Sequence, residues 1–364
     1  MTAHRRSARV AMAILWVTTM ACLPCRPDAT DAGLPALARF EPADGYVYHG
    51  AAPNPTVVAG YVDALDEAAI APLIEGIHLG IAGRAGRAPI TRTVRDWLEY
   101  VRDAGRVPHL SLSFTDGFGN PADEILATTT RLDAVIDELG AIIAAFGDPV
   151  FIRLGFEFNG SWNGYTAGVY PRAFRKVVER FRTAGVTNAA TIWCYEPDGP
   201  DDFDAVLDGE SACYPGDDVV DWFGLDLFGP DHFTAPTSTR ARGNSAYERS
   251  LRFLEMASAQ GKPVMLSENA AVKAYVTSDA DDPGLVDGRS DWETWFGPFF
   301  AFIADHPQIK GFLYMNQDYR NTVYELEHGW GDCRIETNSY ILDRYRDMLH
   351  DERFVHAIEG LSGS

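Results

Sequence analysis

The sequence predicts a single (β/α)8 barrel, and three observations favour this fold. The 364 residues are 46% hydrophobic and 12% aromatic, which is enough apolar material for the core of one large domain. From about residue 44 onward, eight short apolar runs alternate with eight helical patterns, the order expected of a parallel α/β barrel. A doubly wound sheet, the alternative, usually carries a GxGxxG phosphate loop after its first strand, and "HGAAPNP" has none. We therefore expect one domain over residues 44–364.

Eight short apolar runs are typical of buried parallel strands. They are Tyr46–Gly50, Ile77–Ile81, Val107–Phe114, Val150–Glu157, Ala190–Glu196, Val220–Phe228, Pro263–Glu268 and Ile309–Gln317. In a barrel of this kind the functional groups come from the carboxyl ends of the strands and from the loops that follow them. The residues that end these runs are therefore the first candidates for chemistry.

Helical patterns occupy the segments between the strands. They cover residues 66–76, 91–105, 121–146, 170–185, 201–209, 245–261, 291–307 and 338–351. Several carry end signals, such as Thr91 at the start of its helix and Gly105, Gly185 and Gly261 immediately after theirs. Neither a break in composition nor an internal repeat indicates a second domain.

The amino terminus has the pattern of an export signal. A basic start at residues 4–9 precedes an apolar run at residues 10–21 that is too short to span a membrane comfortably. We therefore expect a signal over residues 1–25, a linker at 26–43, and a secreted or cell-envelope location. Small residues before Cys22 suggest bacterial lipoprotein processing and a lipid anchor at that cysteine, and ordinary cleavage without acylation is the open alternative.

The charge balance is acidic, with 31 Lys and Arg against 52 Asp and Glu and a formal net charge of -21. Such a surface repels nucleic acid and anionic membranes, so these partners are not expected. Neutral or cationic partners fit better, and among glycans a neutral chain is favoured over a polyanion. We expect the protein to act as a monomer.

Three cysteines lie beyond the expected signal. Cys194 lies within a predicted strand and is expected to be a small core residue. Cys213 and Cys333 lie in loop-like contexts and are the favoured disulfide pair in an oxidising compartment. No CxxC spacing follows the signal and no HExxH occurs, so we expect neither a metal nor another cofactor.

The stretch "FIRLGFEFNGSWNGY", residues 151–165, places two charges at the end of the fourth strand. Period-two alternation puts Arg153 and Glu157 on one face and apolar residues on the other. A buried ion pair between them is an alternative to a catalytic role. The seventh strand ends at Glu268, and alternation groups Val264, Leu266 and Glu268 on one face.

Two glutamates at the ends of strands four and seven face each other across the mouth of a barrel. At a separation of about 5 to 5.5 Å, one carboxylate can attack an anomeric carbon while the other protonates the leaving oxygen, with net retention of configuration. Two carboxylates at that distance do not both ionise readily, so we expect a raised pKa for the acid.

Three motifs resemble glycoside hydrolase family 26, and the resemblance covers residues 46 to 350. The stretches "RLGFEFNGSWNGY", "YPGDDVVDWFGLDLF" and "KPVMLSENA" are similar to the family patterns around its acid/base, its sixth strand and its nucleophile. The resemblance implies a (β/α)8 barrel, Glu157 as general acid/base and Glu268 as nucleophile. Members of this family include secreted endo-β-1,4-mannanases, xylanases and mixed-linkage glucanases.

Three positions depart from the family pattern. Phe156 stands where a histidine usually precedes the acid/base, and Phe228 replaces a tyrosine that often hydrogen-bonds the nucleophile. Met315 stands where a sugar-stacking tryptophan is common. The chain therefore resembles a divergent member, and mannan is not implied as its substrate.

Six further side chains are candidates for substrate binding around the two glutamates. Arginine, aspartate and amide groups orient carboxylates and bind sugar hydroxyls, whereas aromatic rings cover the apolar faces of pyranoses. The candidates are Arg153, Asn159, Trp162, Asp226, Phe228 and Gln317.

The sequence as a whole predicts a secreted retaining glycoside hydrolase. We expect it to cleave β-glycosidic bonds within a polysaccharide, whether β-mannan, xylan or a related β-glycan, by a double displacement that uses Glu157 and Glu268. The alternative from another class is a non-catalytic glycan-binding envelope protein on the same barrel, which the changes at Phe156 and Phe228 motivate.

Overall fold

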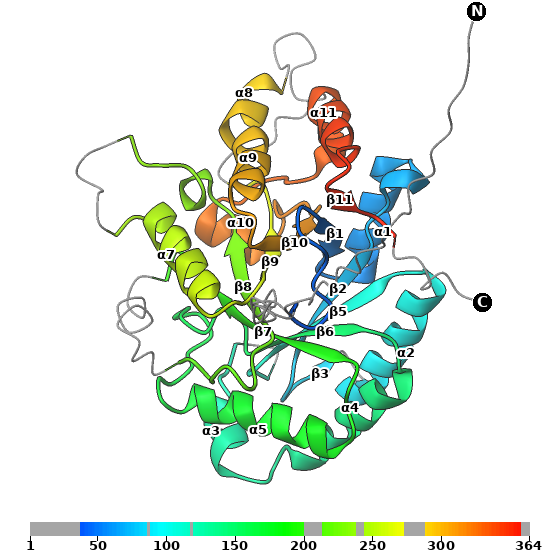
Figure 1. The fold of residues 1–364 in the computed structure, drawn as a ribbon, viewed down its shortest axis with the longest axis vertical. Coiled ribbons are helices and arrows are strands. Elements are labelled where there is room, and N and C mark those ends of the chain that lie inside the picture. The colour runs from blue at the N-terminus through cyan, green and yellow to red at the C-terminus, as the bar shows by residue number, and fades with distance from the viewer. Residues whose placement is uncertain are drawn as a thin grey trace, which may run out of the picture. The chain divides into compact units, whose positions relative to one another are not determined.

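Eight parallel strands close into a barrel, as predicted (Figure 1). The computed structural model describes residues 37–85, 88–116, 119–199, 213–237, 244–272 and 288–357. The strands follow one another around the barrel in chain order, and the last pairs with the first, so the barrel has no open edge. They are β1 (Val47–Ala52), β2 (Ile74–Gly80), β5 (Val107–Ser113), β6 (Val150–Leu154), β7 (Ala189–Tyr195), β8 (Trp222–Leu227), β9 (Val264–Asn269) and β10 (Ile309–Met315).

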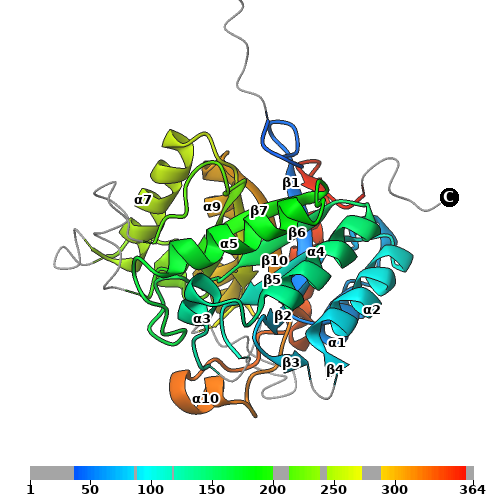
Figure 2. The ribbon, with the colours of Figure 1, turned by 90° about the horizontal axis from the view of Figure 1, so that it is seen from below.

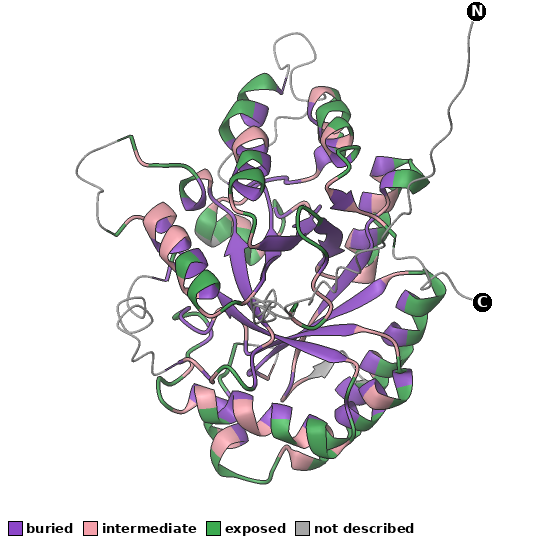
Figure 3. Ribbon diagram, in the orientation of Figure 1, coloured by how far each residue is buried: buried purple, intermediate pink, exposed green. Residues whose placement is uncertain are grey.

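Helices surround the strands, with their exposed faces turned to solvent (Figure 3). The longer ones are α1 (Pro55–Leu65), α2 (Ile90–Asp103), α4 (Asp133–Phe146), α5 (Tyr170–Thr183), α7 (Ala246–Ala259), α9 (Gly297–Asp305) and α11 (Ser339–Leu349). Short elements are α3 (Asp123–Thr128), α8 (Arg289–Asp291), the π-helix η4 (Trp292–Phe296), α10 (Val323–His328), and the 3-10 turns η1 (Ala68–Ile70), η2 (Pro230–His232) and η5 (Ile335–Thr337). A hairpin of β3 (Arg84–Ala85) and β4 (Ala88–Pro89) follows β2, and β11 (Phe354–Val355) pairs with β1.

Two predicted helices differ from the structure. The predicted helix at 66–76 is wrong, because α1 precedes it and β2 begins within it. Asn54 caps α1 by accepting hydrogen bonds from two backbone amides of the first turn, and Asp66 ends the helix in a left-handed conformation with φ of 50°. The predicted helix at 121–146 is broken into α3 and α4. The helix predicted at 201–209 lies outside the described residues.

The core has an outer layer between strands and helices and an inner layer within the barrel. Alternate residues of β6 divide between the layers: Ile152 packs with the outer cluster and Phe151 with the inner one. Phe151 meets Trp222 of β8 edge-on inside the barrel, with ring centroids 5.2 Å apart. Rings of this size fill the barrel interior, so the polar residues at the carboxyl ends of the strands stand above an apolar floor.

A chain of polar contacts holds the seam where the barrel closes. His49 of β1 lies 2.7 Å from the Tyr61 hydroxyl of α1 and 3.0 Å from His356 near the carboxyl end. Tyr61 in turn bonds Tyr345 of α11 at 3.0 Å. These contacts join the two ends of the domain at one place.

The cysteine prediction is partly wrong. Cys194 is fully buried in β7, as expected of a core residue. Cys213 and Cys333 are not joined in a disulfide. Cys213 packs in the outer cluster and Cys333 in the inner one, so each fills space among apolar side chains. Within the described residues, we find no helix whose length and hydropathy would allow it to cross a bilayer.

Candidate active site

A buried arginine joins two acidic side chains at the carboxyl ends of the strands. Arg153 of β6 forms ion pairs with Asp226 of β8 and with Glu268 of β9. Arg153 and Asp226 are fully buried, and Glu268 is nearly so. The Phe156 ring covers the guanidinium, with its centroid 4.2 Å from Cζ. The arginine therefore supplies the positive charge of an otherwise acidic and water-poor site.

A β-bulge turns Glu268 into the barrel. The register between β8 and β9 pairs Leu225 with Leu266 and Asp226 with Glu268, so Ser267 is an extra residue in β9. Leu266 packs in the outer cluster. The predicted common face for Leu266 and Glu268 is therefore wrong, because the extra residue shifts the alternation by one place.

Glu157 reaches the site by a turn rather than by the strand that was predicted. Strand β6 ends at Leu154, and both Gly155 and Glu157 have positive φ, of 50° and 51°. The indole Nε1 of Trp162 donates a hydrogen bond to Glu157 Oε2 at 2.5 Å. Gly160 makes room for this ring, because a Cβ there would lie 2.3 Å from the indole. The positive φ of Glu157 is uncommon for a non-glycine residue and is typical of functional turns.

Three carboxylates converge at this point. One oxygen from each of Glu157, Asp226 and Glu268 lies within 4.8 Å of the others. The predicted acid and nucleophile are therefore brought together at the mouth of the barrel, although they are 111 residues apart in the chain (268 minus 157). The third carboxylate, Asp226, was predicted only as a substrate-binding group.

The surroundings give the three carboxylates different proton affinities. Burial, reinforced by the negative charge of Glu268, raises the pKa of Glu157 to about 7. Burial also acts on Glu268, but the nearby charges of His78 and Arg153 outweigh it and lower the pKa of this group. Burial raises the pKa of Asp226 well above its usual value, despite its ion pair with Arg153. Glu157 is thus suited to carry a proton near neutral pH, whereas Glu268 is held ionised.

His78 is a site residue that the sequence analysis missed. It lies in β2, and its Nδ1 is 3.6 Å from Glu268 Oε1. Its ring contacts Phe156 at a centroid distance of 5.7 Å. A histidine among the apolar residues of a predicted strand, three places from its end, was the available signal.

The match to known families follows this geometry. The sequence profile of glycosyl hydrolase family 26 matches residues 120–285, the part of the chain that contains both glutamates. This part of the chain is similar to glycosyl hydrolase family 26.

Curated proteins resemble this chain in sequence, and a solved structure resembles it in fold. The chain is 30% identical over 244 residues to a protein named beta-1,3-xylanase from Alcaligenes sp., which is 62% of this chain and 48% of that protein. A beta-1,3-xylanase from Vibrio sp. is 30% identical over 243 residues, with the same coverage of 62% and 48%. The chain therefore spans about half the length of these curated relatives. A Bacillus subtilis mannanase structure shares the fold, with a TM-score of 0.55, 18% identity, and coverage of 86% of this chain and 88% of that one.

The predicted binding residues fall into two groups. Trp162 is 48% exposed beside Glu157, and Gln317 is half-buried just after β10. Asn159 and Phe228 are buried instead. The Asn159 amide donates to the Glu196 carbonyl at 2.6 Å and accepts from the Glu196 amide at 3.1 Å. Its hydrogen-bonding groups are therefore engaged with the backbone, and sugar binding by Asn159 remains a prediction that its environment does not favour.

A second polar cluster lies beside the carboxylates and was also missed. His232 is fully buried, 3.2 Å from Asp198 and 3.7 Å from Glu196. Its Nδ1 accepts a hydrogen bond from the Phe228 amide at 3.2 Å. Glu196 ends a predicted strand, which was the available signal. Because one imidazole nitrogen is already bonded to the backbone, we interpret the cluster as a brace between two loops rather than as a metal centre.

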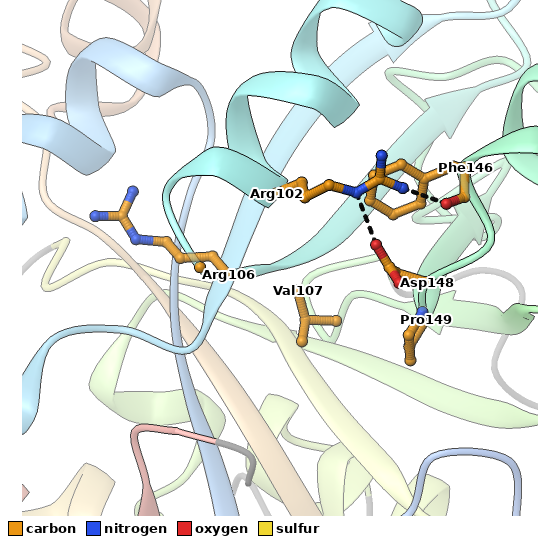
Figure 4. Close-up of a pocket in the computed structure, with 7 residues that line it drawn as sticks. Arg102, Arg106, Val107, Phe146, Asp148 and Pro149 are labelled. Atoms are coloured by element: carbon orange, nitrogen blue, oxygen red, sulfur yellow. Dashed lines mark hydrogen bonds and ion pairs between the residues drawn. The ribbon is translucent and has the colours of Figure 1, made fainter. Parts of the chain in front are cut away.

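A shallow pocket lies at the other end of the barrel (Figure 4). It is lined by residues near the amino ends of β5 and β6, including Val107 and Pro149. Arg102 crosses it, bonding Asp148 at 2.8 Å and covering the Phe146 ring at 4.1 Å. The pocket is remote from the carboxyl ends of the strands and has no part in the site.

Proposed function

We propose that this chain is a retaining glycoside hydrolase that cleaves β-glycosidic bonds within a polysaccharide. The observation that carries the proposal is the approach of Glu157 and Glu268, with oxygens within 4.8 Å, together with a pKa of about 7 for Glu157. Retaining glycosidases hold their two carboxyl groups about 5 to 5.5 Å apart, whereas inverting ones leave about 6.5 to 9.5 Å for a water molecule. The short separation favours a covalent intermediate.

The reaction follows as two displacements. Glu268, ionised beside Arg153 and His78, attacks the anomeric carbon while Glu157 donates its proton to the departing glycosidic oxygen. Glu157 is then a carboxylate and takes a proton from water, which attacks the anomeric carbon and releases Glu268. Each step leaves Glu157 in the protonation state that the next step needs.

Neighbouring groups position the pair. Arg153 fixes one oxygen of Glu268 through its ion pair, and Asp226 holds the other side of the guanidinium. Trp162 directs the Glu157 carboxylate through its indole N–H. His78 faces Glu268 from β2 at 3.6 Å, but burial and the charge of Arg153 lower the pKa of His78, so Arg153 is the cation that favours the ionised nucleophile near neutral pH.

The substrate class comes from the relatives. Two of them are named beta-1,3-xylanases, and a structural neighbour is a mannanase. We propose a neutral β-glycan and rank β-1,3-xylan first, ahead of β-1,4-xylan, β-mannan and mixed-linkage glucan. The acidic balance of the chain, -21, is consistent with a neutral substrate.

The decisive experiment compares the purified chain with Glu157→Ala and Glu268→Ala on these polysaccharides, with new reducing ends as the readout. We expect release by the parent and its loss in both variants. Proton NMR of the first product gives the stereochemistry, and we expect the β-anomer to appear first. An α-anomer would refute the retaining mechanism, and full activity of Glu268→Ala would refute the nucleophile. Binding without release on every glycan would support the non-catalytic alternative.

We also propose that residues 1–25 direct export, that 26–43 form a linker, and that the barrel domain over 44–364 acts as a monomer. The basic start and short apolar run support this. Mass spectrometry of the mature amino terminus tests it: a lipid on Cys22 supports an anchored form, a new terminus at residue 22 or 26 without lipid supports secretion, and an intact Met1 excludes both. Size-exclusion chromatography tests the monomer.

A further inference from the structure

Aromatic side chains gather above the strand that carries Glu268. Strand β9 lies between β8 and β10 in the barrel. Phe228 follows β8, and Tyr319 follows β10. The chain after β10 then forms α10. In Figure 2, α10 lies at the same end of the molecule as β3, which directly follows the carboxyl end of β2. The end of β9 is therefore flanked on both sides by aromatic residues.

These residues form one continuous set of ring contacts, which we call the aromatic wall. Trp330 contacts Phe228 at a centroid distance of 4.9 Å and Tyr319 at 4.8 Å, so it links the ends of β8 and β10. Tyr324 of α10 lies 4.7 Å from Trp330 with an interplanar angle of 30°. Tyr319 meets Tyr324 edge-on, at 5.6 Å and 78°. The wall thus consists of Phe228, Tyr319, Tyr324 and Trp330.

The wall has a buried side and an open side. Phe228 is 6% exposed and Tyr319 is 2% exposed, so they form its back. Tyr324 is 45% exposed and Trp330 is half-buried, and their rings, tilted by 30° to each other, form its front. Trp330 packs against the inner cluster of the core, yet both rings keep part of their surface open to solvent. They offer flat apolar area of the kind that binds the face of another ring.

Charged contacts fix the loop that carries the wall. Arg320 bonds Asp318 at 2.9 Å and Asp332 at 3.0 Å, and Arg334 bonds Asp332 at 2.7 Å. Glu325 of α10 accepts a hydrogen bond from the Gly331 amide at 2.7 Å. The rings are thus positioned before any ligand arrives, which lowers the entropy cost of binding.

The wall lies at the same end of the barrel as the carboxylates, after the two strands that neighbour β9. Burial raises the pKa of Tyr324, and the negative charges of Glu268 and Glu157 raise it further. Trp162 follows β6, the fourth strand of the barrel, whereas the chain that carries most of the wall follows β10, the eighth strand. The wall and Trp162 therefore lie on opposite sides of the mouth, with the wall on the Glu268 side.

We propose that Tyr324 and Trp330 form a sugar-binding platform on the Glu268 side of the cleft. This platform takes the apolar faces of pyranose rings in the part of the polysaccharide that becomes bonded to Glu268. The assignment rests on the proposed hydrolase function, because that function defines which part of the chain is transferred to the nucleophile. A β-glycan presents such C–H faces without charge, which suits exposed tyrosine and tryptophan rings.

The test uses aryl glycosides, which report on this side of the cleft alone. Dinitrophenyl β-glycosides of xylobiose, mannobiose and cellobiose carry sugars only on the side that is transferred, and dinitrophenolate departs without a proton from Glu157. Tyr324→Ala is compared with Leu326→Ala, a matched change on the same helix at a side chain that is 87% exposed. Trp330→Phe, which keeps a ring, is the second variant, and circular dichroism checks the fold of each.

We expect Tyr324→Ala to lower kcat/KM on the preferred aryl disaccharide roughly tenfold, mainly through KM, because it exposes one ring face of the sugar. We expect Leu326→Ala to stay within about twofold of the parent. An unchanged kcat/KM for Tyr324→Ala overturns the platform while leaving the hydrolase intact. An equal loss in Leu326→Ala also overturns it, in favour of a general apolar surface.

A parent that cleaves no substrate removes the hydrolase function but still allows a test of the platform. Migration in gels containing each polysaccharide then gives the readout. Retardation of the parent and of Leu326→Ala, but not of Tyr324→Ala, supports the platform without catalysis. Equal retardation of all three proteins, or of none, overturns it.

Discussion

Replacing Trp162 by phenylalanine is predicted to shift the pH dependence of the reaction toward higher pH. The change removes the indole N–H that donates a hydrogen bond to Glu157 Oε2 at 2.5 Å, and it keeps an aromatic ring in the cleft. The hydrogen bond stabilises the ionised carboxylate and so lowers the pKa of Glu157. Without it, the pKa rises above the value of about 7 that burial and Glu268 set. Since Glu157 must be protonated to act as the acid, activity then persists to higher pH.

The magnitude follows from the exposure of the donor. A buried hydrogen bond to a charged group contributes about 1.5–3 kcal/mol, and because Trp162 is 48% exposed we expect roughly 1 kcal/mol for its loss. A pKa unit corresponds to about 1.4 kcal/mol, so the expected shift is roughly 0.7 of a pH unit. The assay is kcat/KM of the Trp162→Phe variant against pH on the polysaccharide that the parent cleaves.

A second variant separates this effect from lost sugar stacking. Gly160→Ala leaves the tryptophan in the chain but displaces its ring, because the new Cβ would lie 2.3 Å from the indole. We expect the same direction of shift in both variants. A basic limb that stays in place, or that moves to lower pH, would refute the assignment of Trp162 as a positioning residue for Glu157.

The remaining predictions concern stability. Arg153→Met removes the arginine that pairs with two buried carboxylates, so we expect the free energy of unfolding to fall by about 3–5 kcal/mol in urea titrations, and unchanged stability would contradict the ion-pair network. Gly155→Ala places a Cβ 2.6 Å from neighbouring rings at a φ of 50°, so we expect a loss of about 2 kcal/mol or more, and a neutral effect would contradict the turn. Burial lowers the pKa of His49 and of His356, so the unfolded chain binds more protons than the folded chain. The contribution of these histidines to the free energy of unfolding is therefore present above about pH 6.5 and is lost as the pH falls. Thermal melts between pH 7 and 5 test this. If the melting temperature of His356→Gln falls as much as that of the parent over this range, groups other than His356 take up the protons.

Much of the barrel could be predicted because buried parallel strands are short apolar runs, and all eight runs became strands of the described structure. The exceptions have local causes. The sequence analysis did not predict helix α1, although Asn54 is a residue type that caps helices and apolar residues follow it. Strand alternation failed at both glutamates: a left-handed turn carries Glu157, and an extra residue turns Glu268 inward. Period-two counting assumes a regular strand, and these strands are irregular where the chemistry lies.

The companions of the glutamates were harder to predict than the glutamates themselves. His78 is one polar residue in an apolar strand, and no spacing along the chain relates it to Glu268. Asn159 sits in the motif that suggested sugar binding, yet its amide is engaged with the backbone of residue 196. Residue type and motif indicate what a side chain can do, whereas its partners depend on which strands are neighbours in the barrel.

The bulge in β9 has a consequence for moving this chemistry into another protein. If this glutamate were placed on a regular strand of a different barrel, with the serine before it paired in the ordinary way, its side chain would point toward the surrounding helices. The transferable unit is therefore the irregular strand end, "LSEN", together with the partner strand that tolerates its additional residue. An active-site design based on this protein would therefore need to reproduce the β-bulge as well as the side chains.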